Sequence, residues 1–265
     1  MTPRLTAAQI AEFNEKGYLI RPSFFDAEEI ALLHEIALAD KNMEKAGGPV
    51  DAGGRASRLH LRNDLPDDIY SACVRARRMV ETLEQLLGGE VYHYHHKMML
   101  KEPRVGGAWE WHQDFGYWYQ QYLTPAMGSA MIAVDRATKA NGCLQVIPGS
   151  HRCGRIEHQQ VGQQTGANPE RVQAVLRHLP LVHVELEPGD TLFFHSNLLH
   201  SSDRNESENP RWTLICCYNT RSNPMMQNKD RWHPAYSYLN RLEDEEVRRV
   251  GLRQIEELHA LPALS

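Results

Sequence analysis

The sequence of 265 residues has little of what binds membranes or nucleic acids. It has no apolar run long enough for a membrane-spanning helix, and its first residues lack the apolar core of a secretion signal. The formal net charge is −5, so no basic excess favours nucleic acid or an anionic membrane. We therefore expect a cytoplasmic protein with no nucleic-acid partner and no membrane partner.

Cysteine is also scarce. The chain has 5 cysteines, an odd number, at spacings that match no zinc knuckle. Cys216 and Cys217 are adjacent in an expected strand, so their side chains should point to opposite faces. We predict that all the cysteines are reduced thiols, as is usual in the cytoplasm. Hydrophobic residues make up 42% of the chain, which together with its length allows one domain with a large core.

Helix signals frame a central stretch of short strands. Capping patterns and apolar periodicity predict several helices in the first part, one of them over about 67–87, and a last helix over about 242–259. The glycine-rich stretch Gly47–Gly54 is typical of a mobile loop. The expected parts of a single domain, 1–265, are helical support in 1–90, a jelly-roll core in 91–220 and a C-terminal helical segment in 221–265.

The central stretch has the pattern of an antiparallel barrel or double sheet. Short β-rich runs alternate with Asn-Gly and Pro-Gly turns. The expected strands lie at 91–100, 128–136, 143–147, 181–186, 191–195 and 212–218. An insert near 155–180 carries one helix, with Asn168 as its cap and Pro169 in its first turn. Strands of this length and spacing favour a mainly β fold with flanking helices, such as a jelly roll.

His112 and Asp114 are candidate metal ligands because of their spacing. Residues two positions apart on an extended segment leave the backbone on the same side. A lone His-x-Asp pair is common by chance. Here the pair lies between Trp111 and Phe115, and such apolar neighbours favour a lined cavity over a solvated loop.

A third ligand is expected from the later part of the chain. His200 and His195 compete for this place, and we favour His200 because it precedes two serines and lies nearer Arg211. Two imidazoles and one carboxylate make a facial triad that suits non-haem Fe(II) and leaves positions open for oxygen and a cosubstrate. Arg211 opens a strand; inside a barrel its guanidinium would need a carboxylate, which its planar fork binds bidentately. A surface arginine is the plainer alternative.

These motifs in this order resemble the phytanoyl-CoA dioxygenase (PhyH) family of Fe(II)- and 2-oxoglutarate-dependent oxygenases. The likeness spans about residues 5–219 and is nearest to the branch of ectoine hydroxylase and free amino-acid hydroxylases. The motifs that carry it are His112-x-Asp114, Asn141 to His151, Pro188 to His195, His200 and Arg211. The resemblance implies a double-stranded β-helix, the jelly roll of the cupins.

The resemblance also implies a role for each site residue. His112, Asp114 and His200 would be the catalytic residues that hold iron. Arg211 would bind the distal carboxylate of 2-oxoglutarate, with Ser202 assisting. Oxygen would be consumed, and succinate and CO2 released. Related halogenases lack the carboxylate ligand, so its presence here favours hydroxylation.

Two positions depart from the pattern of the ectoine hydroxylase branch. His95 stands where that branch has a glutamine that helps to bind 2-oxoglutarate, and Met99 stands where it often has asparagine. An imidazole can still donate a hydrogen bond, but in a pH-dependent way. We therefore count both residues among the expected cosubstrate contacts.

Aromatic and basic residues near the ligand pair are candidates for the substrate. The rings that follow the pair could hold an alkyl chain or cage an ammonium group by cation–π attraction, and ordinary packing under a loop is the alternative. The candidates are Lys97, Trp111, Tyr117, Trp118 and Arg221. We predict a small polar substrate, such as an amino acid, a betaine-like compound or an aminophosphonate.

Other interpretations stay open at this point. The family name allows an acyl-CoA substrate, although the acidic net charge weighs against a multiply phosphorylated carrier. A non-catalytic cupin-like metal-binding protein and a zinc hydrolase are further possibilities, but neither gives Arg211 a purpose. On the strand of 91–100, His93 and His95 are expected to share a face, and with His96 they could form a second metal site without any carboxylate.

Overall fold

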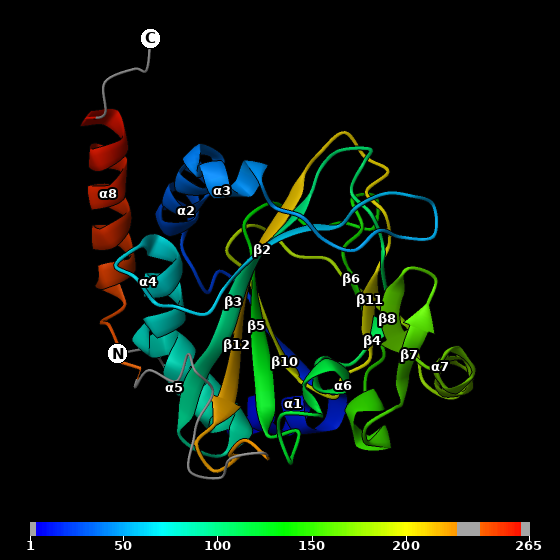
Figure 1. Ribbon diagram of the computed structural model, residues 1–265. Helices are drawn as coiled ribbons and strands as arrows, with labels where there is room; N and C mark the ends of the chain where they lie inside the picture. The colour runs from blue at the N-terminus through cyan, green and yellow to red at the C-terminus, as the bar shows by residue number, and fades with distance from the viewer. Residues whose placement is uncertain (1–3, 227–238, 261–265) are drawn as a thin grey trace.

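The computed structural model describes residues 4–226 and 239–260, and in it two antiparallel sheets face each other (Figure 1). One sheet has six strands in the order β1-β10-β5-β12-β3-β2, and the other has four in the order β4-β11-β6-β9. The strands are β1 (Tyr18–Arg21), β2 (Arg58–Arg62), β3 (Val91–Lys101), β4 (Trp109–His112), β5 (Met127–Ala133), β6 (Leu144–Val146), β9 (Val182–Val184), β10 (Thr191–His195), β11 (His200–Ser202) and β12 (Arg211–Thr220). This is the jelly roll that the strand pattern predicts.

Helices cover the outer face of the six-stranded sheet (Figure 1). They are α1 (Ala7–Lys16), α2 (Ala27–Ala39), α3 (Lys41–Glu44), α4 (Ile69–Arg75) and α5 (Arg77–Leu87), and α8 (Glu245–Ala260) packs outside α2 and α4. Because side chains alternate along a strand, Met98 and Leu214 point into this apolar layer. Cys216 lies in the same layer while Cys217 lies in a different cluster, so the two adjacent cysteines do face opposite ways. All five cysteines are free thiols, as predicted.

Local signals set the helix ends. A capping box formed by Thr6 and Gln9 begins α1, and a second formed by Asp26 and Glu29 begins α2. Gly17 ends α1 with φ at 82°, and a Cβ there would lie 2.4 Å from the His151 ring. Glycine is therefore required both by the backbone conformation and by the close neighbour.

The helix expected over 67–87 is two helices. The chain breaks at Ala76, whose ψ is 132°, because Leu242 pairs there: Arg77 N–H donates to its carbonyl at 2.8 Å. The last helix packs mainly on α2 and α4. Its Gly251 lies against Leu32 and Ile69. None of the helices in the described ranges combines the length and the apolar character needed to cross a bilayer.

The structure contains strands in two stretches where the sequence predicted only helices. The stretch 1–90 is not only helical support, since it also supplies β1 and β2, the two edge strands of the larger sheet. The insert near 155–180 has its predicted helix, α7 (Pro169–Leu176), but a hairpin of β7 (His158–Val161) and β8 (Gln164–Ala167) precedes it. Such short strands depend on partners distant in sequence, so local patterns do not reveal them.

The glycine-rich stretch expected as a mobile loop is anchored by Asp51. The carboxylate is 2% exposed and accepts two hydrogen bonds from Arg204, at 2.7 and 2.9 Å. It also accepts backbone N–H groups of Gly53, Arg55 and Ala108. Asp51 thus ties this loop to the segment after β11 and to the residue before β4.

Candidate active site

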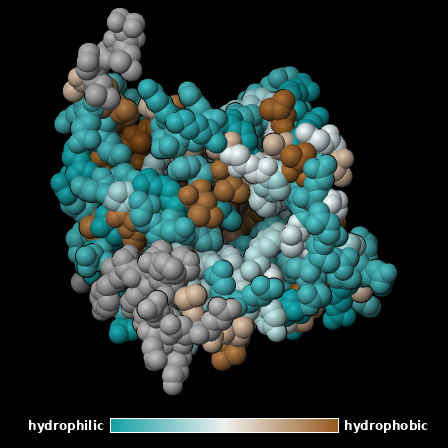
Figure 2. All heavy atoms as spheres, viewed as in Figure 1, coloured by the Kyte–Doolittle hydropathy of each residue, from teal (hydrophilic) through white to brown (hydrophobic). Residues whose placement is uncertain are grey.

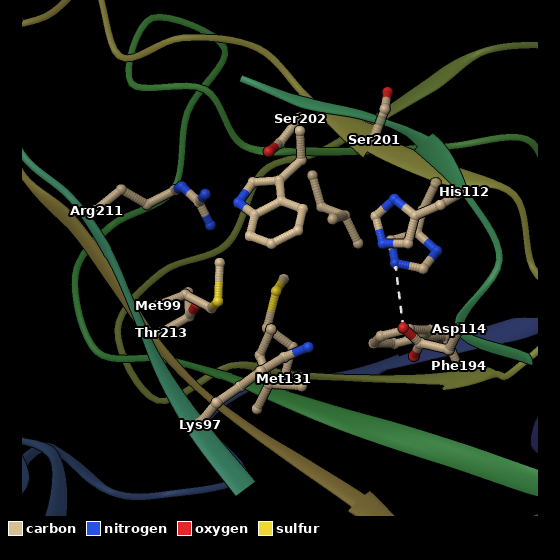
Figure 3. A pocket seen from close by; sticks show the side chains of 14 residues that line it. Lys97, Met99, His112, Asp114, Met131, Phe194, Ser201, Ser202, Arg211 and Thr213 are labelled. Atoms are coloured by element: carbon tan, nitrogen blue, oxygen red, sulfur yellow. Dashed lines mark ion pairs between the residues drawn. The ribbon is translucent and has the colours of Figure 1, made fainter. Parts of the chain in front are cut away.

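Three side chains meet between the two sheets. His112 ends β4, His200 begins β11 directly opposite it, and Asp114 begins the short helix α6 (Asp114–Trp118). Their ligand atoms lie within 4.8 Å of one another, and all three residues are buried. Figure 3 shows His112 and Asp114 on one side of the cavity. His200 Nε2 lies 3.9 Å from Asp114 Oδ1. Within 4–226 and 239–260 this is the only group of three side chains that could hold a metal.

Both imidazoles are held in the form that a metal requires. The Nδ1–H of His112 donates to the Glu110 carbonyl at 2.7 Å, and that of His200 donates to the Leu198 carbonyl at 2.9 Å. Because a carbonyl oxygen only accepts, each Nε2 keeps its lone pair for a metal. Burial lowers the pKa of both histidines, and the neighbouring His200 lowers that of His112 further. The site therefore offers two neutral imidazoles and one carboxylate.

His195, the alternative third ligand, lies outside the group of metal ligands. The Nδ1 of His195 accepts the backbone N–H of Asn197 at 3.0 Å, and its ring lies 5.5 Å from that of His151. Its neighbour Phe194 faces the other way and packs on the His200 ring at 5.1 Å. Alternation along β10 therefore separates His195 from the metal ligands.

Arg211 lies on the opposite wall of the cavity (Figure 3). It is 3% exposed and makes no ion pair with any described residue, and its Nε has no hydrogen-bond partner. Burial lowers its pKa to about 10, so it stays cationic at neutral pH. Thr213 Oγ1 and Trp109 Nε1 in the same cavity are also buried without partners. Buried polar groups of this kind are rare in native proteins, so they indicate a ligand with hydrogen-bond acceptors.

A second buried basic residue, Lys101, lies behind Ser202. Lys101 pairs with Arg211 in the register of β3 and β12, and its Nζ donates to Ser202 Oγ at 2.9 Å and to the Asp203 carbonyl. Burial lowers the pKa of Lys101 well below its usual value, and the nearby Arg211 adds to this. The interaction orients Ser202, whose own proton is then free to point into the cavity.

The cavity lies between the metal-ligand group and Arg211. Its other lining residues include Lys97, Met99, Met131, Leu144, Phe194, Ser201 and Ile215. The face of the molecule in Figure 2 is hollowed near its centre, with apolar surface beside the hollow. The metal-ligand group and the unpaired arginine thus line the same cavity.

Known proteins are similar to this chain in sequence and in fold. The family model for phytanoyl-CoA dioxygenase (PhyH) matches residues 13–213. The chain belongs to the PhyH family. The sequence is 29% identical over 229 residues to L-proline trans-4-hydroxylase from Streptomyces griseoviridis, covering 80% of this chain and 85% of that protein. It is 29% identical over 236 residues to ectoine dioxygenase from Halomonas elongata, covering 83% and 71%.

Solved structures share the fold over most of the chain. EctD from S. alaskensis with bound Fe has a TM-score of 0.75 and 24% identity, covering 90% of this chain and 88% of that one. EctD with 2-oxoglutarate and 5-hydroxyectoine has a TM-score of 0.71. The double-stranded β-helix expected from the resemblance is confirmed. The expected enzyme class, an Fe(II)- and 2-oxoglutarate-dependent dioxygenase that also uses O2, is confirmed by family membership.

A β-bulge changes which residues of β4 face the cavity in this PhyH-family enzyme. Between His200 and Ser202 the pairing shifts, so that His112 and Trp109 pair with two residues only two positions apart. Trp109 therefore lines the cavity beside His112, with ring centroids 6.0 Å apart. The candidate Trp111 packs instead in the apolar cluster around Ile147, away from the cavity.

A second β-bulge changes which way the side chains of β3 point. It shifts the pairing between Cys217 and Tyr218, so His93 turns to His96, with 3.1 Å between their ring nitrogens. The expectation that His93 and His95 share a face is therefore wrong. His95 lies instead against Trp118, at 5.6 Å between ring centroids.

The remaining candidates divide between the cavity and the surface. Lys97 and Met99 line the cavity as expected, but His95 and Trp118 lie beside it in an aromatic cluster and do not. Arg211 pairs with Lys101, which lies six residues, or roughly 20 Å of extended strand, beyond His95. His95 is therefore too far from Arg211 to contact the same carboxylate. Arg221 is outside the site: its side chain pairs with Glu90 at 3.0 Å and is half exposed.

Tyr117 lies at the rim beside the metal ligands. Its ring centroid is 5.3 Å from that of His112, and its hydroxyl donates to the Thr165 carbonyl at 2.7 Å. Trp109, Thr213 and Lys101 were not foreseen. Thr213 could have been predicted, because side chains two positions apart on a strand share a face and Arg211 lines the cavity. Trp109 could not, because it faces the cavity only through the bulge.

Proposed function

We propose that this enzyme hydroxylates an unactivated C–H bond of a small polar acid, with release of succinate and CO2. The observation that carries the proposal is the buried group of His112, Asp114 and His200 facing an unpaired buried Arg211 across one cavity. The first three would hold Fe(II), and the fourth would hold 2-oxoglutarate. When bound, these two cofactors supply the oxidising chemistry, while the protein orients the reactants and excludes water.

The fit of 2-oxoglutarate rests on the polar groups around Arg211. Its guanidinium can bind the distal carboxylate bidentately. Ser202 and Thr213 offer hydroxyl groups to the same carboxylate, and Met99 forms part of the wall beside them. A bound dicarboxylate would thus satisfy donors that have no partner within the described chain.

The substrate class follows from Lys97. Its ammonium group points into the cavity (Figure 3) and makes no hydrogen bond or ion pair with any described residue. An amino acid, a betaine-like compound and an aminophosphonate all carry an anionic group that this ammonium could bind. The relatives named for proline and ectoine act on small molecules, which supports the same size class.

The proposal is tested by succinate release. With Fe(II), 2-oxoglutarate and air, the protein should release succinate slowly, and faster when a correct acid is added. His112→Ala and Asp114→Ala should abolish release while circular dichroism shows an intact fold. Either variant retaining release would contradict the ligand assignment. If only an acyl-CoA in the substrate panel accelerates release, the small-acid proposal is wrong.

A further inference from the structure

One oxygen of Asp114 is held by a serine that lies outside the motifs that carry the resemblance. Ser129 on β5 donates its hydroxyl proton to Asp114 Oδ2 at 2.9 Å, and both residues are buried. The other oxygen, Oδ1, lies 3.9 Å from His200 Nε2. The carboxylate therefore presents one oxygen to the hydroxyl and the other to the metal-binding imidazoles.

Cys217 settles the direction of the Ser129 proton. Cys217 pairs with Ser129 in the register of β12 and β5, and its Sγ lies 3.3 Å from Ser129 Oγ. A hydroxyl has one proton, and a carboxylate accepts it far better than a sulfur atom does. The hydroxyl thus donates to Asp114, and the thiol proton points to Ser129 Oγ. Burial raises the pKa of Cys217 to about 12, so the thiol keeps that proton.

We propose that Ser129 is a positioning residue that keeps Asp114 a ligand through one oxygen only. This inference rests on the proposed ligand set. With Oδ2 held by Ser129, only Oδ1 faces the metal. Without the hydroxyl, the carboxylate is no longer fixed with Oδ1 towards the metal-binding imidazoles, and its rotation would weaken metal binding and change the coordination geometry. Cys217 supports the arrangement by fixing the hydroxyl rotor.

The test uses Co(II) binding to the metal-free protein, without turnover. Ser129→Ala should raise the dissociation constant for Co(II) roughly ten- to hundred-fold and change the visible spectrum, which reports coordination geometry. Ser129→Thr keeps the hydroxyl and should restore both. Ser71→Ala is the matched control, because it removes another buried hydroxyl, on α4, far from the site. Identical Co(II) affinity and spectra in Ser129→Ala and the control would overturn the proposal.

Two further variants separate the possible failures. Asp114→Ala should lose Co(II) affinity; if it does not, the ligand assignment itself is wrong. If Asp114→Ala loses affinity and Ser129→Ala does not, only the positioning role is wrong. Cys217→Ala should weaken Co(II) binding less than Ser129→Ala, and the two should not add, because Cys217 acts through Ser129. Additive effects would remove Cys217 from the proposal.

Discussion

Single side chains decide what the cavity can bind. Arg211 and Lys97 are both cations without a partner among the described residues, but they differ in surroundings. Arg211 is buried in the cavity that Thr213 and Ser202 also line, whereas Lys97 is partly exposed. The first suits an obligatory cosubstrate, and the second suits an exchangeable substrate.

Replacing Arg211 by Met should raise the concentration of 2-oxoglutarate required roughly ten- to hundred-fold, since charge-assisted hydrogen bonds contribute about 1.5–3 kcal/mol. Succinate release as a function of 2-oxoglutarate concentration measures this. Arg211→Lys keeps the charge but loses the planar fork, so it should rescue only in part. An unchanged requirement for 2-oxoglutarate in Arg211→Met would remove this residue from the cosubstrate site.

Replacing Lys97 by Met should raise the KM for the acidic substrate roughly tenfold or more, because one ion pair in the cavity is lost. The requirement for 2-oxoglutarate should change much less. Lys97→Arg, which retains the charge, is the control. Steady-state kinetics with each reactant varied in turn distinguish the two effects. A larger change for 2-oxoglutarate than for substrate would place Lys97 on the cosubstrate instead.

Pairs of elements decide the shape of the site. Two bulges, one between β4 and β11 and one between β3 and β12, turn Trp109 into the cavity and His93 away from His95. Bulges commonly re-aim side chains beside active sites. At the other end, Asp51 connects the loop after α3 to β4 and to the segment after β11.

The Asp51 connection predicts a pH dependence of stability. The Arg204 guanidinium holds the pKa of this carboxyl well below its usual 3.8. A lowered folded-state pKa means that the contribution is complete above about pH 4. It is lost as the pH falls from there towards the folded-state value. Asp51→Asn should therefore melt a few degrees below the native protein at pH 7, and the difference should shrink in acid. A difference that stays constant with pH would contradict this account.

At the scale of the whole molecule, the helical layer supports the sheet that carries Arg211 and Lys97. The metal ligands lie on the opposite sheet and on α6, so a bound metal and cosubstrate would connect the two. Ligands that bind only the folded state stabilise it by mass action.

Adding Mn(II) and 2-oxoglutarate at about a hundred times their dissociation constants should therefore stabilise the protein by about 2.7 kcal/mol for each. For a chain of this size each should raise the melting temperature by roughly 5–10 °C. A thermal-shift measurement checks this. His200→Ala should abolish the shift from metal, and Arg211→Met only the shift from 2-oxoglutarate. Equal shifts in all variants would show that binding occurs elsewhere.

The sequence by itself determined the features that depend on local chemistry. The caps at Thr6 and Asp26, the strand at Thr191–His195 and the pair His112 and Asp114 follow from residue types and spacing within a few positions. The choice of His200 over His195 also agrees with the structure, since alternation along β10 is a local property.

Only the tertiary structure decided which side chains share the cavity. Trp109 replaces Trp111, and Lys101 stands behind Ser202, because strands distant in sequence pair in a particular register with a bulge. Ser129 reaches Asp114 in the same way. Register and bulges are set by packing across the sheet, and a one-residue shift reverses every side chain. No pattern within a single strand contains that information.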